Sequence, residues 1–570
     1  MEVIVIGGSA AGLKAACRIA RLKPDAAVKV LVRDRYFGVS ACGMAFYLAG
    51  DIDDFKALIS TPNGTVKDEV YYRDVKGIEV LARREVLAID RAARLVRFRE
   101  LDTGREKSLP YDKLVIATGA EPLVPAIPGV DSPGVAYFAD FEQAVQLRHD
   151  LERGMIERVA IVGAGFVGLE LCEAFRAMWG VEVELIELQP QVLPGLVDPE
   201  LAVLVEEELI EQGVSIRLGC RCNEIVNDEN HICVFDLAGE GIHVDRVIIT
   251  VGVRPNVDLA RAAGLEIGSA GGIKVDAHLA TNDPDIFAAG DCVELVNALN
   301  GRNGVWSFGS LASRMGRVVG DNVCNGDSQF NPIVCATVFK VFDITVGTVG
   351  MTAVECRSDG YEIGESWGTF HDRLFYYPGA TTMNVKLVYD KSSGEVLGFQ
   401  GLSRGSLLHE INAASQLIRQ RVTVDKLPEF EHAYSPPFAQ PLDPLHYLAY
   451  IADNSRSAGI GLVPPHEFLD LPTDTVVLDS RSPHEIESRP LDVEAKRRIE
   501  IPVEKLRSRI REVPSDAQIV TVCQTGGRSW DAALMLRRAG WNQVSILAGG
   551  ALFLPKSSAD RSGSTAGTEG

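Results

Sequence analysis

Apolar residues near the start of the chain form two short runs separated by a helix-like pattern. Val3–Gly7 and Val28–Val32 are apolar runs typical of buried strands, and Leu13–Leu22 has apolar side chains at helical spacing. This order predicts a strand–helix–strand unit. A glycine-rich turn precedes the helix, so an anion is expected at the helix N-terminus.

The same pattern returns later in the chain. Val159–Val162 predicts a strand, a helix follows to Trp179, and Val181–Glu187 predicts the next strand. A glycine turn between strand and helix is typical of a dinucleotide site, so two such units predict two bound nucleotides. The first turn consists of Gly7, Gly8, Ser9, Ala10, Ala11 and Gly12, with serine at the second glycine position, whereas the second turn has all three glycines, Gly163, Gly165 and Gly168.

The pattern changes in the second half of the chain. Strand-like runs such as Val338–Val346 and Val385–Tyr389 mix with one helical segment, Leu407–Arg419, which indicates an α+β part. The polar run Asp453–Gly459 has the composition of a linker. A compact α/β unit follows, and Ser557–Gly570 has the Ser, Gly and Thr content of a disordered tail.

Length and charge exclude several classes of protein. With 570 residues, the chain should form about three to five domains. Its net charge of −21 argues against binding to nucleic acid or an anionic membrane. No apolar run approaches the ~20 residues of a membrane span, and the first strand begins too early for a signal peptide. Eleven cysteines without regular spacing favour a reducing cytoplasm.

Two cysteines stand where a thiolate would be stabilised. Cys42 lies in Ser-Ala-Cys-Gly-Met at a predicted helix N-terminus, and Cys523 opens Cys-Gln-Thr-Gly-Gly-Arg-Ser between a predicted strand and helix. Arg528 would add positive charge to the second loop or order it. Cys220 and Cys222 have no second cysteine pair, so we expect a structural role and no metal site. Two reactive sulfurs beside two nucleotide sites indicate a redox enzyme that acts on sulfur.

Two further segments, Leu114–Ala120 and Asp285–Asp291, resemble hallmarks of the flavoprotein reductases with two dinucleotide-binding domains. The resemblance implies that Asp291 contacts the flavin of FAD and that the second glycine unit binds a nicotinamide nucleotide. Phe37 stands where dithiol members have a second cysteine. The chain therefore resembles the single-cysteine branch, which includes CoA-disulfide reductase, NADH oxidase, NADH peroxidase and NADH-dependent persulfide reductase. Ala117, Thr118, Gly119 and Gly290 are also expected to bind cofactor.

The acidic residue after each second strand bears on the choice of nucleotide. Glu187 would accept hydrogen bonds from a ribose 2′-hydroxyl and repel a 2′-phosphate, which favours NADH over NADPH. In the first unit Val32 occupies that position, followed by Arg33 and Asp34. Either Asp34 binds the ribose through a shift of one or two residues, or ribose binding differs here. Glu170 either orients the nicotinamide or caps its helix.

Substrate contacts are predicted on the first helix and beside the first sulfur. Lys14, Arg18 and Arg21 share one helix face, which would either hold the phosphates of coenzyme A or form a solvated face. Ser40, close to Cys42, is also expected to contact substrate.

Three other positions bear on the reaction. Ala10 stands where related oxidases and peroxidases place a histidine, which favours disulfide or persulfide substrates. Tyr376 and Tyr434 lie in segments that resemble the family's dimerisation domain. The resemblance implies a homodimer in which a partner's tyrosines approach the active-site sulfur and supply a proton. Packing at the dimer interface is the alternative role for both tyrosines.

The C-terminal unit resembles a rhodanese domain. Cys523–Arg528 is similar to the family's Cys-Arg-x-Gly-x-Arg loop, with Gln524 in place of the first arginine, which leaves anionic donors such as thiosulfate in doubt. Leu478–Pro483 resembles the family's Asp-x-Arg signature, and Ala548–Gly550 resembles its closing turn. The resemblance implies that Cys523 carries sulfane sulfur.

We therefore predict an α/β chain with two Rossmann-like dinucleotide-binding domains, an α+β dimerisation domain and a C-terminal α/β rhodanese-like domain. The expected function is an FAD-dependent oxidoreductase that uses NADH to reduce persulfide, polysulfide or CoA disulfide through Cys42. The alternatives are an NADH oxidase with an accessory rhodanese domain, or a sulfur carrier with a regulatory flavin module. The expected parts are residues 1–155 and 276–330 (FAD binding), 156–275 (nicotinamide nucleotide binding), 331–452 (dimerisation), 453–462 (linker), 463–555 (rhodanese) and 556–570 (tail).

Overall fold

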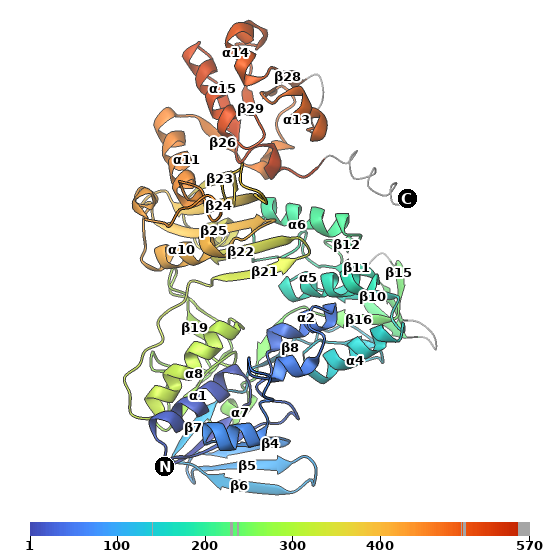
Figure 1. The fold of residues 1–570 in the computed structure, drawn as a ribbon, viewed down its shortest axis with the longest axis vertical. Helices are drawn as coiled ribbons and strands as arrows, with labels where there is room; N and C mark the ends of the chain where they lie inside the picture. Colours follow the sequence, from blue (N-terminus) through green and yellow to red (C-terminus); the bar gives the residue numbers. More distant parts are fainter. Residues whose placement is uncertain (140, 228–231, 236–238, 492, 494–496, 557–570) are drawn as a thin grey trace. The chain divides into compact units, whose positions relative to one another are not determined.

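The computed structural model describes residues 1–556 except 140, 228–231, 236–238, 492 and 494–496 (Figure 1). The chain divides into two compact units. The first comprises Met1–Ile186 and Arg221–Ile333, and the second comprises Glu187–Cys220 and Val334–Gly570. The predicted disordered tail lies outside the described residues.

A parallel sheet with the order β18-β7-β1-β2-β3 forms the base of the first unit. Its central strand is buried on both faces, because Val3, Ile4 and Val5 are fully inaccessible to solvent, as expected for a parallel sheet covered by helices. The strands are β1 (Glu2–Ile6), β2 (Ala27–Leu31), β3 (Glu79–Leu81), β7 (Lys113–Ile116) and β18 (Ile286–Ala288).

Helices α1 (Ala10–Leu22) and α8 (Gly309–Val323) lie side by side in this unit (Figure 1). Glycines on α8 permit the close approach. A Cβ on Gly316 would lie 2.4 Å from the backbone oxygen of Ala11, and one on Gly320 would lie 2.6 Å from Cβ of Arg18. This packing fixes the N-terminal ends of both helices relative to each other.

A second parallel sheet repeats the design within the first unit. Four of its strands have the order β11-β10-β16-β9, and α5 (Phe166–Glu173) follows β10. The predicted helix to Trp179 continues as a π-helical turn, η4 (Ala174–Met178). These strands are β9 (Val135–Ala136), β10 (Arg158–Val162), β11 (Glu182–Ile186) and β16 (Arg246–Ile249).

Smaller elements complete the first unit. They are short helical segments, some of which surround Cys42, and strands of small antiparallel sheets. The helical segments are η1 (Ala41–Gly43), α2 (Met44–Ala49), η2 (Phe55–Ile59), α3 (Glu69–Tyr71), η3 (Tyr72–Lys76), α4 (Phe141–Glu152) and α7 (Asp258–Ala262). The strands are β4 (Arg84–Asp90), β5 (Leu95–Glu100), β6 (Glu106–Pro110), β8 (Ala120–Pro122), β13 (Glu224–Asn227), β14 (Ile232–Phe235), β15 (Gly241–Val244), β17 (Val253–Pro255), β19 (Leu295–Val296) and β20 (Asn303–Gly304).

The second unit contains an antiparallel sheet with the order β21-β22-β25-β24-β23. The predicted single strand over Val338–Val346 is wrong, because the segment is a hairpin that turns at Phe342, whose φ is +48°. The strands are β21 (Thr337–Val341), β22 (Ile344–Gly350), β23 (Ile363–His371), β24 (Thr382–Asp390) and β25 (Val396–Ser403). The other elements of this part are α6 (Pro199–Glu211), β12 (Ser215–Arg217), α9 (Ala353–Ser358), α10 (Leu408–Arg419) and η5 (Leu427–Glu429).

The run that composition predicted to be a linker is largely helical. Helix α11 (Pro444–Ala458) extends through it and ends at Gly459, which has a φ of +60°. The helix starts with a capping box at Asp443 and proline at its first position, which are strong start signals. The polar residues from Asp453 onward therefore belong to the last turns of a helix.

The C-terminal part of the second unit is a parallel sheet with the order β26-β30-β29-β27-β28. Its core includes the fully buried Leu478, Ile519 and Leu536. The strands are β26 (Gly461–Val463), β27 (Val476–Asp479), β28 (Arg498–Glu500), β29 (Ile519–Val522) and β30 (Val544–Leu547). The helices are α12 (Pro465–Phe468), α13 (Pro483–Ser488), α14 (Val503–Arg509), η7 (Ile510–Glu512), α15 (Gly527–Arg538) and η8 (Ala551–Phe553).

The predicted fold class, two Rossmann-like parts followed by an α+β and an α/β part, is confirmed. Among the described residues, no helix has the length and apolar character to cross a membrane.

Candidate active sites

The first glycine turn is packed so tightly that side chains are excluded. Gly7 has a φ of +114°, and a Cβ there would lie 2.0 Å from the backbone oxygen of Ala117. A Cβ on Gly12 would lie 2.1 Å from the backbone oxygen of Gly7. Both distances are far below van der Waals contact, so these two positions require glycine. The turn therefore brings bare backbone to the N-terminus of α1, as a phosphate site needs.

The second glycine turn has the same geometry. Gly163 has a φ of +110°, and a Cβ on Gly168 would lie 2.1 Å from the backbone oxygen of Gly163. A Cβ on Gly165, in contrast, would meet no protein atom within 4 Å. The protein itself therefore does not require glycine at the middle position. Ser9, its counterpart in the first turn, has an ordinary extended φ of −100°.

The two predicted flavin-binding segments, Leu114–Ala120 and Asp285–Asp291, both pack against the first glycine turn. Gly290 has a φ of +88°, and a Cβ there would lie 3.0 Å from Cβ of Ala11. Burial raises the pKa of neighbouring Asp291, although a hydrogen bond with Ser307 opposes the shift. Thr118 donates its hydroxyl to the backbone oxygen of Asn256 at 2.7 Å, which holds the Ala-Thr-Gly segment in place. No motif in the sequence pointed to Asn256.

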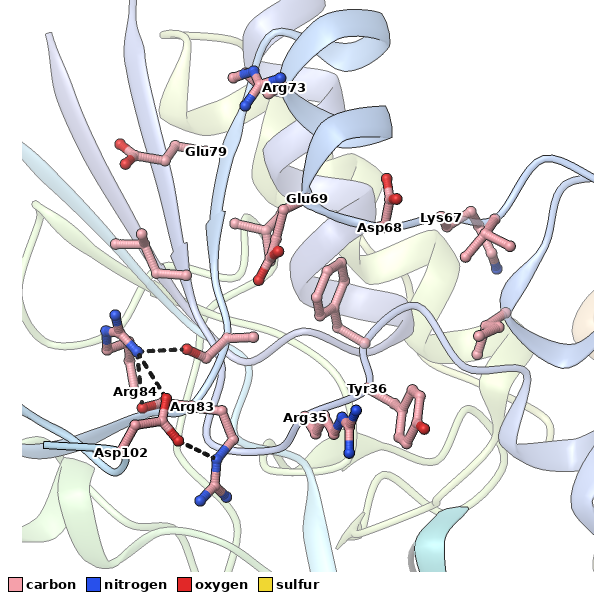
Figure 2. Close-up of a pocket in the computed structure, with 16 residues that line it drawn as sticks. Arg35, Tyr36, Lys67, Asp68, Glu69, Arg73, Glu79, Arg83, Arg84 and Asp102 are labelled. Carbon is pink, nitrogen blue, oxygen red and sulfur yellow. Dashed lines mark hydrogen bonds and ion pairs between the residues drawn. The ribbon is translucent and has the colours of Figure 1, made fainter. Parts of the chain in front are cut away.

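A pocket of about 630 Å³ lies beyond the carboxyl ends of β2 and β3, the edge at which α/β sheets bind ligands (Figure 2). Arg35, Tyr36 and Glu79 line it, whereas Arg33 and Asp34 are not among its lining residues. Arg33 pairs instead with Asp34 at 3.3 Å, and both side chains are exposed.

The two predicted carboxylates of the second nucleotide unit have different surroundings. Burial raises the pKa of Glu170, on α5, to about 7, and the nearby Glu173 adds to the shift. Glu187 follows β11 in the chain and is buried, and its carboxylate accepts a hydrogen bond from the backbone nitrogen of Gln189 at 2.8 Å.

Cys42 is exposed at the centre of η1. Its sulfur faces the start of the 15-residue helix α8, because a Cβ on Gly309 would lie 3.7 Å from Cys42 Sγ. A helix N-terminus favours negative charge at such a position. Position 37 is a phenylalanine, so it cannot form a local disulfide with Cys42. The Phe37 side chain is buried, with 8% of its surface exposed. Ser40 precedes η1 as its N-terminal cap residue.

The predicted basic face of α1 is divided between two environments. Arg18 forms an ion pair with Asp321 of α8 at 2.5 Å, and both side chains are largely buried. Burial raises the pKa of the Cys17 thiol, and three cations oppose the shift, Lys76 most strongly, followed by Arg21 and Lys14. The positive group near Cys17 therefore includes Lys76, which the sequence pattern of α1 could not reveal.

Cys523 is fully buried, and backbone N–H groups surround its sulfur. The backbone nitrogens of Gly526 and Ser529 donate to Cys523 Sγ at 3.1 and 3.2 Å. Helix α15 starts at Gly527, so its first turn supplies the second donor. This arrangement stabilises a thiolate or a persulfide anion.

Arg528 is held by a carboxylate that sequence reasoning missed. It donates to both oxygens of Glu485, with one distance of 2.9 Å, and this contact lowers the pKa of Glu485 to about 2. Glu485 also belongs to the capping box that starts α13 with Ser482. The Ser-x-x-Glu spacing could have predicted the helix start but not the pairing with Arg528.

Asp479 and Arg481 of the predicted Asp-x-Arg signature form a fully buried ion pair beside this loop. Arg481 also donates to the backbone oxygen of Arg489 at 2.7 Å. Arg481 therefore ties the end of β27 to the C-terminal end of α13.

Tyr376 and Tyr434 lie on the surface of the second unit, with 64% and 44% of their surface exposed. Neighbouring Phe375 and Phe438 are even more exposed. Large exposed aromatic side chains in one part of a domain are typical of an interface. Among the described residues, no group of three or more His, Cys, Asp or Glu side chains could hold a metal ion.

Comparison with protein families agrees with this architecture. Residues 1–316 match the pyridine nucleotide-disulphide oxidoreductase family, 336–443 match its dimerisation domain and 465–552 match the rhodanese-like domain. The chain belongs to the pyridine nucleotide-disulphide oxidoreductase family and carries a C-terminal rhodanese-like domain.

Relatives place it within that family. The chain is 32% identical over 450 residues to a protein from Methanocaldococcus jannaschii named NADH oxidase, covering 79% of this chain and 98% of the relative. It is 35% identical over 451 residues to the NAD(P)H sulfur oxidoreductase (CoA-dependent) of Pyrococcus abyssi, covering 79% and 97%. Neither match extends over the whole of this chain.

A solved structure matches nearly the whole chain. It is described as an NAD-dependent persulfide reductase from A. fulgidus and has 36% sequence identity and a TM-score of 0.92. The match covers 97% of this chain and 100% of that chain. The predicted enzyme class, a pyridine nucleotide-disulphide oxidoreductase, is confirmed by this family membership.

Proposed function

We propose that the protein is an FAD-dependent reductase that uses NADH to reduce persulfide, polysulfide or CoA disulfide through Cys42 alone. One observation carries the proposal. Cys42 is exposed beside the N-terminus of α8, while buried Phe37 occupies the place of a second cysteine. A lone accessible thiolate must form its disulfide with the substrate, because it has no local partner in the protein.

The glycine turns fit the two cofactors. Gly7 and Gly12 leave bare backbone at the start of α1, where the FAD pyrophosphate would bind, and the pocket lined by Arg35 and Glu79 would take its adenosine half. The turn at Gly163 would bind NADH, with Glu187 accepting from the ribose. When bound, FAD would carry two electrons from NADH to sulfur. If NADPH gave a larger kcat/KM than NADH under matched conditions, the assignment to Glu187 would be wrong.

The proposed chemistry at Cys42 balances without an external oxidant. The thiolate attacks the carbon-bound sulfur of a persulfide RSSH, forming Cys42–S–S–R and releasing HS⁻. Two electrons and a proton then cleave this mixed disulfide to the Cys42 thiolate and RSH. Overall, NADH, H⁺ and RSSH give NAD⁺, RSH and H₂S. With CoA disulfide, the same steps give two thiols.

The phosphates of coenzyme A, which the pantetheine arm separates from its thiol, would bind the positive group formed by Lys14, Arg21 and Lys76. Tyr376 and Tyr434 would reach the partner's Cys42 in a homodimer and protonate the leaving thiolate. Their exposure in the single chain is consistent with an interface role.

The rhodanese part would bind sulfane sulfur on Cys523 and pass it to a small thiol or to Cys42. Its sulfur lies in a cradle of backbone N–H groups. Within the described part of the chain, Gln524 Oε1 and Ser529 Oγ beside that cradle are buried and have no hydrogen-bond partner. Buried polar atoms without partners indicate a place where a ligand binds.

The direct test is anaerobic NADH consumption with sulfide release, measured with CoA persulfide, polysulfide and CoA disulfide in turn. We expect turnover in wild type, none in Cys42→Ser, and wild-type rates in Cys324→Ser, which removes another free cysteine. Activity of Cys42→Ser equal to wild type would refute the single-cysteine mechanism.

An NADH oxidase is the second candidate, favoured by the name of the M. jannaschii relative. It requires oxygen uptake that matches NADH loss without a sulfur acceptor. Ala10 places no acid or base in the first glycine turn, which is the reason to rank this function second.

A further inference from the structure

The antiparallel sheet of the dimerisation domain contacts the rhodanese part at segment 549–552. This segment packs against the loop Cys523–Arg528, which we call the sulfur loop. Thr369 of β23 donates its hydroxyl to the backbone oxygen of Gly549 at 2.8 Å. Asn384 of β24 donates its amide to the backbone oxygen of Leu552 at 3.0 Å and to Thr369 Oγ1 at 3.2 Å. The two residues are a directly opposed cross-strand pair, and both are buried.

The segment that they contact, 549–552, holds the sulfur loop in turn. The backbone nitrogens of Ala551 and Leu552 donate to the backbone oxygens of Cys523 and Gln524 at 2.8 and 3.1 Å. Gly550 packs against the same loop, because a Cβ there would lie 2.6 Å from the oxygen of Gln524 and 2.7 Å from the nitrogen of Gly526. Gly526 is one of the two donors to Cys523 Sγ.

These contacts form one continuous chain of hydrogen bonds and packing. It runs from Thr369 and Asn384 through segment 549–552 to the carbonyls of Cys523 and Gln524, and from there to the donors on the sulfur. Burying a side-chain amide or hydroxyl costs free energy of folding unless the group is hydrogen-bonded. The hydrogen bonds of Thr369 and Asn384 therefore hold the closing segment, 549–552, in one position. A shift of the closing segment would move the loop that presents N–H groups to Cys523 Sγ.

We propose that Thr369 and Asn384 are positioning residues for sulfur transfer at Cys523. They belong to the dimerisation domain and do not touch the sulfur. The dimerisation domain thus completes the rhodanese site by fixing segment 549–552. The proposal rests on the proposed role of Cys523 as a carrier of sulfane sulfur.

Other contacts inside the second unit supply a control. His466 of α12 contacts Glu200 of α6 at 3.4 Å, so it also joins the rhodanese part to the rest of the second unit, through an element other than segment 549–552. A variant His466→Gln weakens this docking alone. Thr348 is a buried threonine on β22, which β25 separates from β24, so Thr348→Val makes the same chemical change away from the closing segment.

The experiment measures sulfur transfer in the full-length protein from glutathione persulfide to cyanide, which yields thiocyanate and glutathione. We expect Thr369→Val to lower kcat about 10-fold and the double variant with Asn384→Leu to lower it further, with KM changed less than kcat. The pH profile of kcat/KM should shift to higher pH, because a distorted cradle stabilises the thiolate less. Thr369→Ser, which keeps the hydroxyl, should restore transfer. Thr348→Val and His466→Gln should behave as wild type.

Wild-type transfer in Thr369→Val, or an equal loss in His466→Gln, would overturn the proposal, since the contact would then serve docking alone. If the wild type itself transferred no sulfur, the proposed function of Cys523 would fail separately. In that case the pH profile of iodoacetamide alkylation at Cys523, read by peptide mass spectrometry, decides the positioning role. A profile displaced in Thr369→Val supports it, and an unchanged profile overturns it.

Discussion

Cys42 and Cys523 stabilise sulfur in opposite ways. Cys42 is exposed and faces the N-terminus of a long helix, whereas Cys523 is fully buried and receives two backbone hydrogen bonds at 3.1 and 3.2 Å. An open thiolate suits attack on a bulky disulfide, because the substrate must reach it. A closed cradle suits storage of one sulfur atom, because its donors satisfy the anion without solvent. The proposed function accordingly assigns reduction to Cys42 and sulfur carriage to Cys523.

The largest expected effect separates the two sulfurs. Cys42→Ser should lower NADH-dependent reduction of CoA disulfide by at least about 10³-fold, because serine cannot form the mixed disulfide. Cys523→Ser should leave that reaction within about twofold of wild type, since CoA disulfide needs no sulfur carrier. Steady-state NADH consumption under argon measures both. A comparable loss in Cys523→Ser would show that the two sites act as one.

The next effect tests the closed cradle. Gly550→Ala should destabilise the rhodanese part by about 1–3 kcal/mol, because Gly550 has a φ of +78° and the new methyl would collide with Gln524. Thiocyanate formation should fall with it, while reduction of CoA disulfide continues. Thermal unfolding followed with a matched Gly527→Ala control, where a Cβ meets no atom within 4 Å, isolates the collision. Equal melting curves would contradict this packing.

A smaller effect concerns the charge beside Cys523. Glu485→Gln should lower sulfur transfer about 10-fold, because Arg528 loses a charged partner that holds it with two hydrogen bonds. The pKa of Glu485 is lowered to about 2, so this pair contributes stability that is fully present above the carboxyl's unfolded value of 4.5 and is lost as pH falls from there through about 2. The Glu485–Arg528 ion pair should thus stay intact between pH 5 and 9, and its effect on the rate of transfer should stay constant over that range. A change in the Glu485→Gln to wild-type rate ratio across that range would contradict the assignment.

The smallest effect concerns docking of the rhodanese part. The contact with Glu200 raises the pKa of His466, although Lys386 opposes the shift and Glu467 adds to it. A raised pKa contributes stability that is fully present below the unfolded value, about 6.5, and is lost as pH rises through the folded value. The contribution should stay under about 1 kcal/mol, because the side chain is 36% exposed. Unfolding of His466→Gln between pH 6 and 9 should lack this pH dependence.

Sequence patterns predicted the parts of this molecule that depend on local backbone constraints. Gly7, Gly12, Gly163 and Gly168 could be recognised because only glycine fits where two backbones nearly touch. The middle position differs, because neither turn's protein atoms require glycine there. Ser9 is therefore compatible with the same turn that has Gly165 in the second unit.

The errors arose where tertiary context overrides composition. The hairpin at Phe342 has a bulky residue at positive φ, without the Asn or Gly that normally marks such a turn. The polar residues after Asp453 continue a helix whose start signals lie at Asp443 and Pro444. The partners of Arg528 and Thr369 lie 43 and 180 residues away in the chain, so no local pattern could reveal them.

The most direct test of the account is transfer of sulfur between the two sites. The protein is loaded with glutathione persulfide, freed of excess donor and analysed by peptide mass spectrometry before and after anaerobic addition of NADH with a catalytic amount of coenzyme A. The account predicts one added sulfur atom on Cys523, released as sulfide on NADH addition in wild type and retained in Cys42→Ser. Sulfur that never appears on Cys523, or that leaves equally well without Cys42, would contradict it.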